Sequence, residues 1–194
     1  MQEKLRELPN LPKDDVPDGK TPDDNAVMRE WGTKPELKKP LDYLTIAERF
    51  GWIDMERGSK VSGSRFGYIL GTAAQLEFAL IQYAQSQLIP KGFTMVVPPA
   101  LIKAESMQAM GYLGGGGESE TYHLPDDDLY LVGTAEQAIG PIHRDEKLDL
   151  TAGPKRYLGF SSAFRREAGS YGKDTKGILR VHQFDKLEMI SLRC

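Results

Sequence analysis

The sequence predicts an α+β domain in which an antiparallel sheet is flanked by helices. Between residues 66 and 88, apolar side chains recur every three or four positions, which is the period of an amphipathic helix. Strand-like segments at 122–124, 129–132 and 157–164 are separated by turn residues, as in antiparallel sheets. A Rossmann-type parallel sheet is disfavoured, because no predicted strand leads directly into Gly-x-Gly-x-x-Gly and a helix.

The composition is that of a globular protein and narrows the possible functions. Hydrophobic residues make up 40% and charged residues 27% of the 194 positions, so the chain as a whole is not disordered. The single cysteine, Cys194, excludes an intramolecular disulfide and a cysteine metal cluster. No apolar run approaches the roughly 18 residues of a membrane span, and the first residues form no secretory signal. With a net charge of −3, we expect a cytoplasmic protein, no membrane partner and only local contacts with nucleic acid.

The first 40 residues lack the pattern of a helix or a strand. Pro9, Pro12 and Pro17 fall close together, and proline excludes regular helix and central strand. We interpret residues 8–40 as an extended linker, with a disordered tail as an equally good alternative from composition.

The next segment alternates predicted helices with glycine-rich connections. Residues 41–50 fit a short amphipathic helix capped by Asp42 or Thr45. Glycines and serines in 57–67 predict a loop, and the long helix of 66–88 ends before Pro90.

The remaining elements follow from short apolar runs and their boundaries. Strands are expected at 93–97, 122–124, 129–132, 157–164 and 178–190, and short helices at 104–110 and at 134–142, the latter with Thr134 as N-cap. The glycine run at 114–117 predicts a loop that is not a phosphate-binding P-loop, because no Gly-Lys-Ser/Thr follows it. A glycine-rich turn is expected at 169–177.

Strand alternation over residues 178–189 would place charged and aromatic side chains on one face. That face would carry Arg180, His182, Phe184, Lys186 and Glu188, and Arg165 and Glu167 share a parity on the opposing strand. Such a face suits a flat, charged ligand. From periodicity alone, a solvated hairpin with cross-strand ion pairs is the favoured alternative.

The amino-acid sequence of this predicted hairpin decides between a ligand-binding face and a solvated hairpin. Residues 164–170 read Phe-Arg-Arg-Glu-Ala-Gly-Ser, residues 172–175 Gly-Lys-Asp-Thr and residues 180–188 Arg-Val-His-Gln-Phe-Asp-Lys-Leu-Glu. This string resembles motif 2 of class II aminoacyl-tRNA synthetases in the form found in the seryl-tRNA synthetase family. Leu-Val-Gly-Thr-Ala-Glu-Gln at 131–137 is similar to the family's Thr-Ala-Glu serine-binding element. The helix and strand of about 66–99 look like motif 1.

The resemblance implies a class II synthetase-like fold, antiparallel sheet flanked by helices, and a two-step reaction. L-Serine and ATP would form seryl-adenylate, and serine would then pass to tRNA(Ser). Because the substrate carboxylate attacks the α-phosphorus, no protein nucleophile is needed, and catalysis is positioning plus charge stabilisation. Arg165 would be the catalytic residue, bridging the α-phosphate and the serine carboxylate, since a guanidinium can hold two anions.

The other implied site residues fall into three groups. The ATP-binding group is Arg165, Arg166, Glu167, Val181, His182, Gln183 and Phe184, with Phe184 stacked on adenine. The serine-binding group is Thr134, Ala135, Glu136, Arg165 and Glu188. Contacts with the tRNA acceptor end are Ser170, Lys173 and Lys176.

The resemblance also implies an incomplete catalytic domain. Residues 1–40 would be a linker after a tRNA-binding coiled-coil arm that is not in this sequence, and residues 41–194 the N-terminal portion of the catalytic domain, with motif 2 at about 157–190. Motif 3 has no counterpart, so the sheet would be incomplete at the C-terminus and this chain alone weak or inactive. Mg²⁺ would accompany ATP, with ligands beyond this sequence and none assigned within it. A homodimer through motif 1 is expected.

Two alternatives remain open at the level of sequence. One is a paralogue that activates an amino acid and loads a carrier protein. The other is a non-catalytic dimerising fragment.

Overall fold

The computed structural model describes residues 8, 11–114, 117–168 and 177–193. The chain divides into two compact units, Met1–Leu41 and Asp42–Cys194. In the first unit, the described backbone is irregular apart from the 3-10 turn η1 (Pro22–Asp24). Asp24 closes this turn, because its Oδ2 accepts hydrogen bonds from the backbone N–H groups of Lys20 and Thr21 at 2.8 and 2.9 Å. The role of this unit as a linker stays a prediction.

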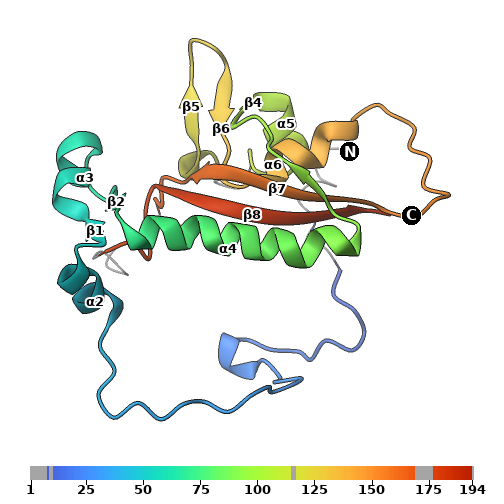
Figure 1. The fold of residues 1–194 in the computed structure, drawn as a ribbon. Helices are drawn as coiled ribbons and strands as arrows, with labels where there is room; N and C mark the ends of the chain where they lie inside the picture. The colour runs from blue at the N-terminus through green and yellow to red at the C-terminus, as the bar shows by residue number, and fades with distance from the viewer. Residues whose placement is uncertain (1–7, 9–10, 115–116, 169–176, 194) are drawn as a thin grey trace. The chain divides into compact units, whose positions relative to one another are not determined.

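The second unit is built on a three-stranded sheet in the order β3-β7-β8. Strands β7 (Lys155–Phe164) and β8 (Gln183–Leu192) pair antiparallel along their full length, from Lys155 opposite Leu192 to Phe164 opposite Gln183. Strand β3 (Thr94–Val96) joins β7 in parallel, so one short pair departs from the predicted antiparallel pattern. Figure 1 shows helix α4 (Thr72–Leu88) running along this sheet.

A second three-stranded sheet has the order β4-β6-β5. It contains β4 (Leu101–Lys103), β5 (Tyr122–Leu124) and β6 (Leu129–Leu131), all antiparallel. The β5–β6 hairpin predicted from the sequence is confirmed. Helix α5 (Ala104–Ala109) follows β4, and its Met107 packs with Ile102 and Val132 in a buried apolar cluster. The 3-10 turn η3 (Gly117–Glu120) precedes β5, and the predicted glycine loop at 114–117 lies partly outside the described residues.

Helix α2 (Tyr43–Phe50) confirms the predicted helix, with Asp42 rather than Thr45 as its N-cap. The Asp42 Oδ1 atom accepts the Thr45 N–H at 3.0 Å. The short strands β1 (Ile53–Asp54) and β2 (Tyr68–Ile69) then pair antiparallel.

The predicted loop at 57–67 is wrong in its first half, which is helix α3 (Met55–Ser62). Asp54 caps this helix by accepting the Arg57 N–H at 2.8 Å. Gly58 is a packing residue rather than a turn residue, because a Cβ there would lie 2.3 Å from the Phe66 carbonyl oxygen. The chain leaves the helix at Gly63, whose φ is +95°.

Three other predicted boundaries are corrected. Helix α4 begins at Thr72 rather than at 66, because residues 68–69 form β2. The predicted helix at 134–142 is α6 (Glu136–Ile139) followed by the 3-10 turn η4 (Gly140–His143), and its N-cap is Ala135 rather than Thr134. The strand predicted from residue 178 begins at Gln183, because residues 178–182 form turns and bends instead of strand. Another 3-10 turn, η2 (Ile89–Lys91), ends α4.

Among the described residues, no helix combines the length and apolar character needed to cross a membrane. The predicted turn at 169–177 lies outside the described residues except for Gly177.

Candidate active site

A cavity of about 960 Å³ opens beside the end of β7 and the start of β8. Its lining comes from the residues that follow α5, from η3, from α6 and the loop before it, from the end of β7 and the residues after it, and from the turn that leads into β8 and the first residues of that strand. The lining includes Tyr112, Gly133, Gln137, Arg165, Glu167, Arg180, Val181 and Phe184. Charged and aromatic side chains therefore share one concave surface, as in many ligand-binding sites.

Arg165 is fixed from two sides. Its backbone N–H donates to the His182 carbonyl at 3.0 Å, which continues the β7–β8 pairing one step beyond the strands. Its side-chain Nε donates to the Gly133 carbonyl at 3.1 Å. The guanidinium carbon lies 5.2 Å from the ring centre of Phe184, within the range of a cation–π contact. The guanidinium and the ring thus share the cavity wall.

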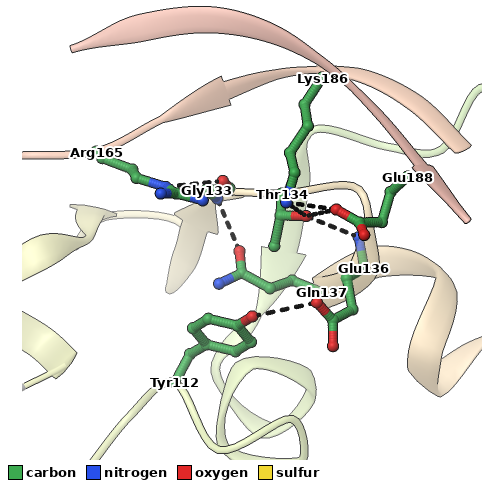
Figure 2. A network of polar contacts seen from close by, with 8 residues as sticks. All are labelled: Tyr112, Gly133, Thr134, Glu136, Gln137, Arg165, Lys186 and Glu188. Atoms are coloured by element: carbon green, nitrogen blue, oxygen red, sulfur yellow. Dashed lines mark hydrogen bonds and ion pairs between the residues drawn. The ribbon is translucent and has the colours of Figure 1, made fainter. Parts of the chain in front are cut away.

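A second group of polar side chains lies on the other side of Gly133 (Figure 2). Thr134 is 1% exposed, and its hydroxyl donates to the Glu188 carboxylate at 3.1 Å. The Lys186 ammonium donates to the same hydroxyl at 3.0 Å and forms an ion pair with Glu188. The Glu136 N–H is 3.4 Å from the Thr134 Oγ1. We call Thr134, Glu136, Lys186 and Glu188 the polar cluster.

Tyr112 connects the polar cluster to the cavity. Its hydroxyl donates to the Glu136 carboxylate at 3.4 Å. Burial, followed by the neighbouring Glu136 carboxylate, raises the pKa of Tyr112, so the phenol stays protonated and remains a donor.

Glu167 and Arg180 form an ion pair at the cavity wall, with Arg180 Nη1 2.5 Å from Glu167 Oε2. The predicted strand parity of Arg165 and Glu167 is wrong, because β7 ends at Phe164 and Glu167 has a left-handed φ of +52°. Arg180 and His182 likewise precede β8 and belong to no strand face. Tertiary packing around the turn brings Glu167 and Arg180 together.

The residues predicted to bind ATP separate into two groups. Arg165, Glu167, Val181 and Phe184 line the cavity. Arg166, His182 and Gln183 do not line it. The Arg166 Nε donates to the Thr121 carbonyl at 2.8 Å, His182 Nδ1 is 2.9 Å from the Arg165 carbonyl oxygen, and Gln183 lines a separate cavity of about 360 Å³. The roles of these three residues as nucleotide ligands stay predictions.

Three of the residues predicted to bind serine meet in the polar cluster: Thr134, Glu136 and Glu188. Ala135 is fully buried, and its methyl group packs toward β7 near Gly159. The predicted tRNA contacts Ser170, Lys173 and Lys176 lie outside the described residues.

Sequence reasoning assigned no site role to three residues of this region, Tyr112, Gln137 and Lys186, although it placed Lys186 on the expected ligand face. Lys186 shares its strand parity with Glu188, so alternation along β8 contained the signal. Gln137 follows the Thr-Ala-Glu string directly and accepts the Gly133 N–H at 2.7 Å. No sequence pattern around Tyr112 predicts a place in the site, because only the fold brings this residue to Glu136.

Comparisons with known proteins show which sequences and folds this chain is similar to. The tRNA synthetase class II core domain (G, H, P, S and T) family matches residues 121–193. The serine–tRNA ligase of Nocardia farcinica is 54% identical over 185 residues, which are 95% of this chain and 44% of that protein. The chain thus spans less than half the length of this curated relative.

Two solved structures share the fold along nearly the whole chain. Seryl-tRNA synthetase from Pyrococcus horikoshii complexed with ATP superposes with a TM-score of 0.88 at 38% identity, covering 97% of this chain and 46% of that one. The cytoplasmic serine–tRNA ligase from Naegleria fowleri in complex with AMP gives 0.90 at 31% identity, covering 98% and 46%. Motif 2, the Thr-Ala-Glu element, the sheet that brings them together and these likenesses agree: the chain belongs to the seryl-tRNA synthetase family of class II aminoacyl-tRNA synthetases.

Proposed function

We propose that this chain is part of the catalytic domain of a serine–tRNA ligase, which activates L-serine with ATP and transfers serine to tRNA(Ser). One observation carries the proposal. Arg165 and Phe184 line one cavity, and the polar cluster begins at the next residue after Gly133, which also lines that cavity. A nucleotide site and an amino-acid site therefore adjoin across one glycine, with Arg165 bonded to that glycine.

ATP would bind with its adenine on Phe184 and its α-phosphate at Arg165. Base–aromatic stacking typically contributes about 1–3 kcal/mol. The 5.2 Å between the Arg165 guanidinium carbon and the Phe184 ring centre supports this arrangement, since the base and the cation would both lie near the ring. Glu167 would accept from the adenine amino group, and the main chain at Val181 would line the base. The ATP and AMP complexes of the two similar structures support a nucleotide ligand.

L-Serine would bind in the polar cluster. Glu188 offers a carboxylate and Thr134 a hydroxyl to an incoming ammonium group and alcohol. Recognition of the serine hydroxyl by buried polar groups would reject alanine, because those groups would then be left unpaired.

In the proposed reaction, a carboxylate oxygen of serine attacks the α-phosphorus of ATP, and the bond from that phosphorus to the pyrophosphate oxygen breaks. Charge on the phosphoryl oxygens grows as the new bond forms. The Arg165 guanidinium stabilises this charge, since a positioned cation in a partly buried site acts more strongly than in water. The 3′-terminal ribose hydroxyl of tRNA then attacks the serine carbonyl, and AMP leaves.

Mg²⁺ is expected to accompany the ATP phosphates. Over the described residues, no group of three or more His, Cys, Asp and Glu side chains has the arrangement of a metal site. Two of the carboxylates beside the proposed ligands, Glu167 and Glu188, pair with Arg180 and Lys186, and the Glu136 carboxylate accepts from Tyr112. These residues do not fit a bound cation, so the proposed mechanism assigns no step to one.

A homodimer through motif 1 is the proposed assembly. Helix α4 carries four large apolar side chains that are more than half exposed, Leu76, Phe78, Leu80 and Tyr83. Exposed apolar residues of this size are typical of a subunit interface. We place the reaction in the cytoplasm, where tRNA charging serves translation. Sedimentation of the wild-type chain and of Phe78→Glu would test the dimer, which the charged side chain should dissociate.

Serine-dependent exchange between ATP and labelled pyrophosphate tests the activation step. Exchange by the wild-type chain, expected above to be weak at best, should depend on serine and not on alanine, and Arg165→Ala should lose it. Arg156→Ala is the matched control, because Arg156 lies at the far end of β7 and bonds the Lys91 carbonyl. Equal exchange by Arg165→Ala and Arg156→Ala would contradict the role of Arg165, and the absence of exchange in folded wild-type chain would contradict activity of this chain.

A further inference from the structure

We propose that Gln137 is a positioning residue for Arg165 and acts through the main chain of Gly133. Gln137 Oε1 accepts the Gly133 N–H at 2.7 Å, and the carbonyl of Gly133 accepts the Arg165 Nε–H at 3.1 Å (Figure 2). One glycine therefore connects a buried amide on α6 to the guanidinium in the cavity. The inference rests on the proposed function of Arg165.

Burial makes the first hydrogen bond hard to replace. Gln137 is 2% exposed, and the residues two positions away on either side, Ala135 and Ile139, are fully buried. Loss of the acceptor would leave the buried Gly133 N–H without a partner, and an unsatisfied buried donor costs about 1–3 kcal/mol.

Gly133 needs this restraint because it has no side chain of its own. A Cβ at this position would lie 3.4 Å from both the Arg165 Cγ and the Phe164 carbonyl oxygen, which is ordinary van der Waals contact, so packing alone does not hold this backbone in place. Glycine has the widest backbone freedom of any residue. The hydrogen bond from Gln137 therefore restricts the backbone where steric limits do not.

The consequence for Arg165 is a fixed guanidinium orientation. With Nε bound to the Gly133 carbonyl, both Nη groups remain available, and within the described part of the chain no hydrogen bond of theirs is seen. These two groups would bind the anionic oxygens at the reacting centre. Catalysis by positioned charge is sensitive to misplacement of about 1 Å, so freeing the Gly133 backbone should reduce the rate more than it reduces binding.

Two substitutions distinguish the role of Gln137 as a hydrogen-bond acceptor from the role of its side chain in packing. Gln137→Met keeps the length of the side chain and removes the acceptor, whereas Gln137→Glu keeps an oxygen in the same place. Gln108→Met, at an exposed position on α5, is the control for the chemical change. In pyrophosphate exchange, Gln137→Met should lower kcat by about 10-fold, since a buried hydrogen bond of this kind corresponds to that factor. The KM for serine should change less, and Gln137→Glu should restore most of kcat.

NMR of the arginine Nε–H groups gives a readout that does not need activity. In the wild-type chain, the Arg165 signal, assigned by its loss in Arg165→Lys, should exchange slowly with water. Gln137→Met should make its exchange faster, and Gln137→Glu and Gln108→Met should leave it slow. An Arg165 signal that exchanges fast in wild type would overturn the proposal, as would equal behaviour of Gln137→Met and Gln137→Glu.

The two proposals fail in different ways. If the wild-type chain shows no exchange with pyrophosphate but the Arg165 signal responds to Gln137→Met, positioning stands and the proposed activity falls. If the wild-type chain catalyses pyrophosphate exchange and Gln137→Met does not change its rate, the positioning role of Gln137 is wrong and the proposed activity stands. Should Gln137→Met fail to fold, the wild-type signal and Gln137→Glu still decide the question.

Discussion

The Thr134 hydroxyl donates a hydrogen bond to the Glu188 carboxylate at 3.1 Å, although 54 positions separate the two residues. One comes from the loop before α6 and the other from the middle of β8. Lys186 binds both of them from the same face of β8. Contacts within the chain therefore connect the side chains of the proposed serine site, and each of these contacts can be altered singly.

Thr134→Ala should raise the KM for serine by about 10-fold or more, because a hydrogen bond to a charged group contributes about 1.5–3 kcal/mol. Thr134→Ser keeps the hydroxyl and should stay near wild type. The KM for ATP should be unchanged in both. Steady-state pyrophosphate exchange measures both KM values, and an unchanged serine KM in Thr134→Ala would exclude this hydroxyl from serine binding.

Lys186→Met should lower the KM for serine by about 2- to 5-fold, the range expected for partly exposed ion pairs. The reason is competition, since the Lys186 ammonium already occupies Thr134 and Glu188, the two groups proposed for the substrate ammonium. The same exchange assay at varied serine concentration tests this. A raised KM would instead indicate that Lys186 attracts the serine carboxylate.

Gly159→Ala should destabilise the domain by about 1–3 kcal/mol, the usual cost of overpacking a core. A Cβ at Gly159 would lie 2.2 Å from Ile139 Cδ1 and 3.1 Å from the Ala135 Cβ, so α6 would have to move away from β7. Ser161→Ala is the control on the same strand, because the buried Ser161 hydroxyl has no hydrogen-bond partner among the described residues. Urea unfolding should show Ser161→Ala equal to or more stable than wild type. If Gly159→Ala is equally stable, close packing of α6 does not require this glycine.

Glu77→Gln should raise the Tm at pH 7 by less than about 4 °C, the shift that 1 kcal/mol produces in a domain of this size. Burial, followed by the neighbouring Asp185 carboxylate, raises the pKa of Glu77. The folded state then binds more protons than the unfolded state, so this residue lowers stability as pH rises above its unfolded pKa of about 4.3. The benefit of Glu77→Gln should vanish near pH 4.

Thermal unfolding at pH 4 and pH 7 measures this effect. Glu48→Gln, on the exposed side of α2, is the control. A benefit that is the same at both pH values would mean that the glutamate acts through packing rather than through its charge.

Local rules predicted the elements whose signals lie within a few residues. The Asp42 cap, the β5–β6 hairpin and the body of α4 all depend on near neighbours in the sequence. The errors arose where distant segments decide. Gly58 reads as a loop residue, but it lies where α3 packs on residues 66–67. The start of β8 at Gln183 depends on pairing with Phe164 rather than on alternation in residues 178–182.

The sequence by itself determined the family and predicted the chemistry proposed for the site, because motif 2 and the Thr-Ala-Glu string are contiguous and their residue types are specific. Only the tertiary structure decided which of these side chains meet. Arg165 reaches the Gly133 carbonyl, Lys186 reaches Thr134, and Gln137 reaches back to Gly133. The physical reason is that a local pattern sets which face a side chain occupies, whereas its partner is set by the packing of α6 and the loop before it against β7 and β8.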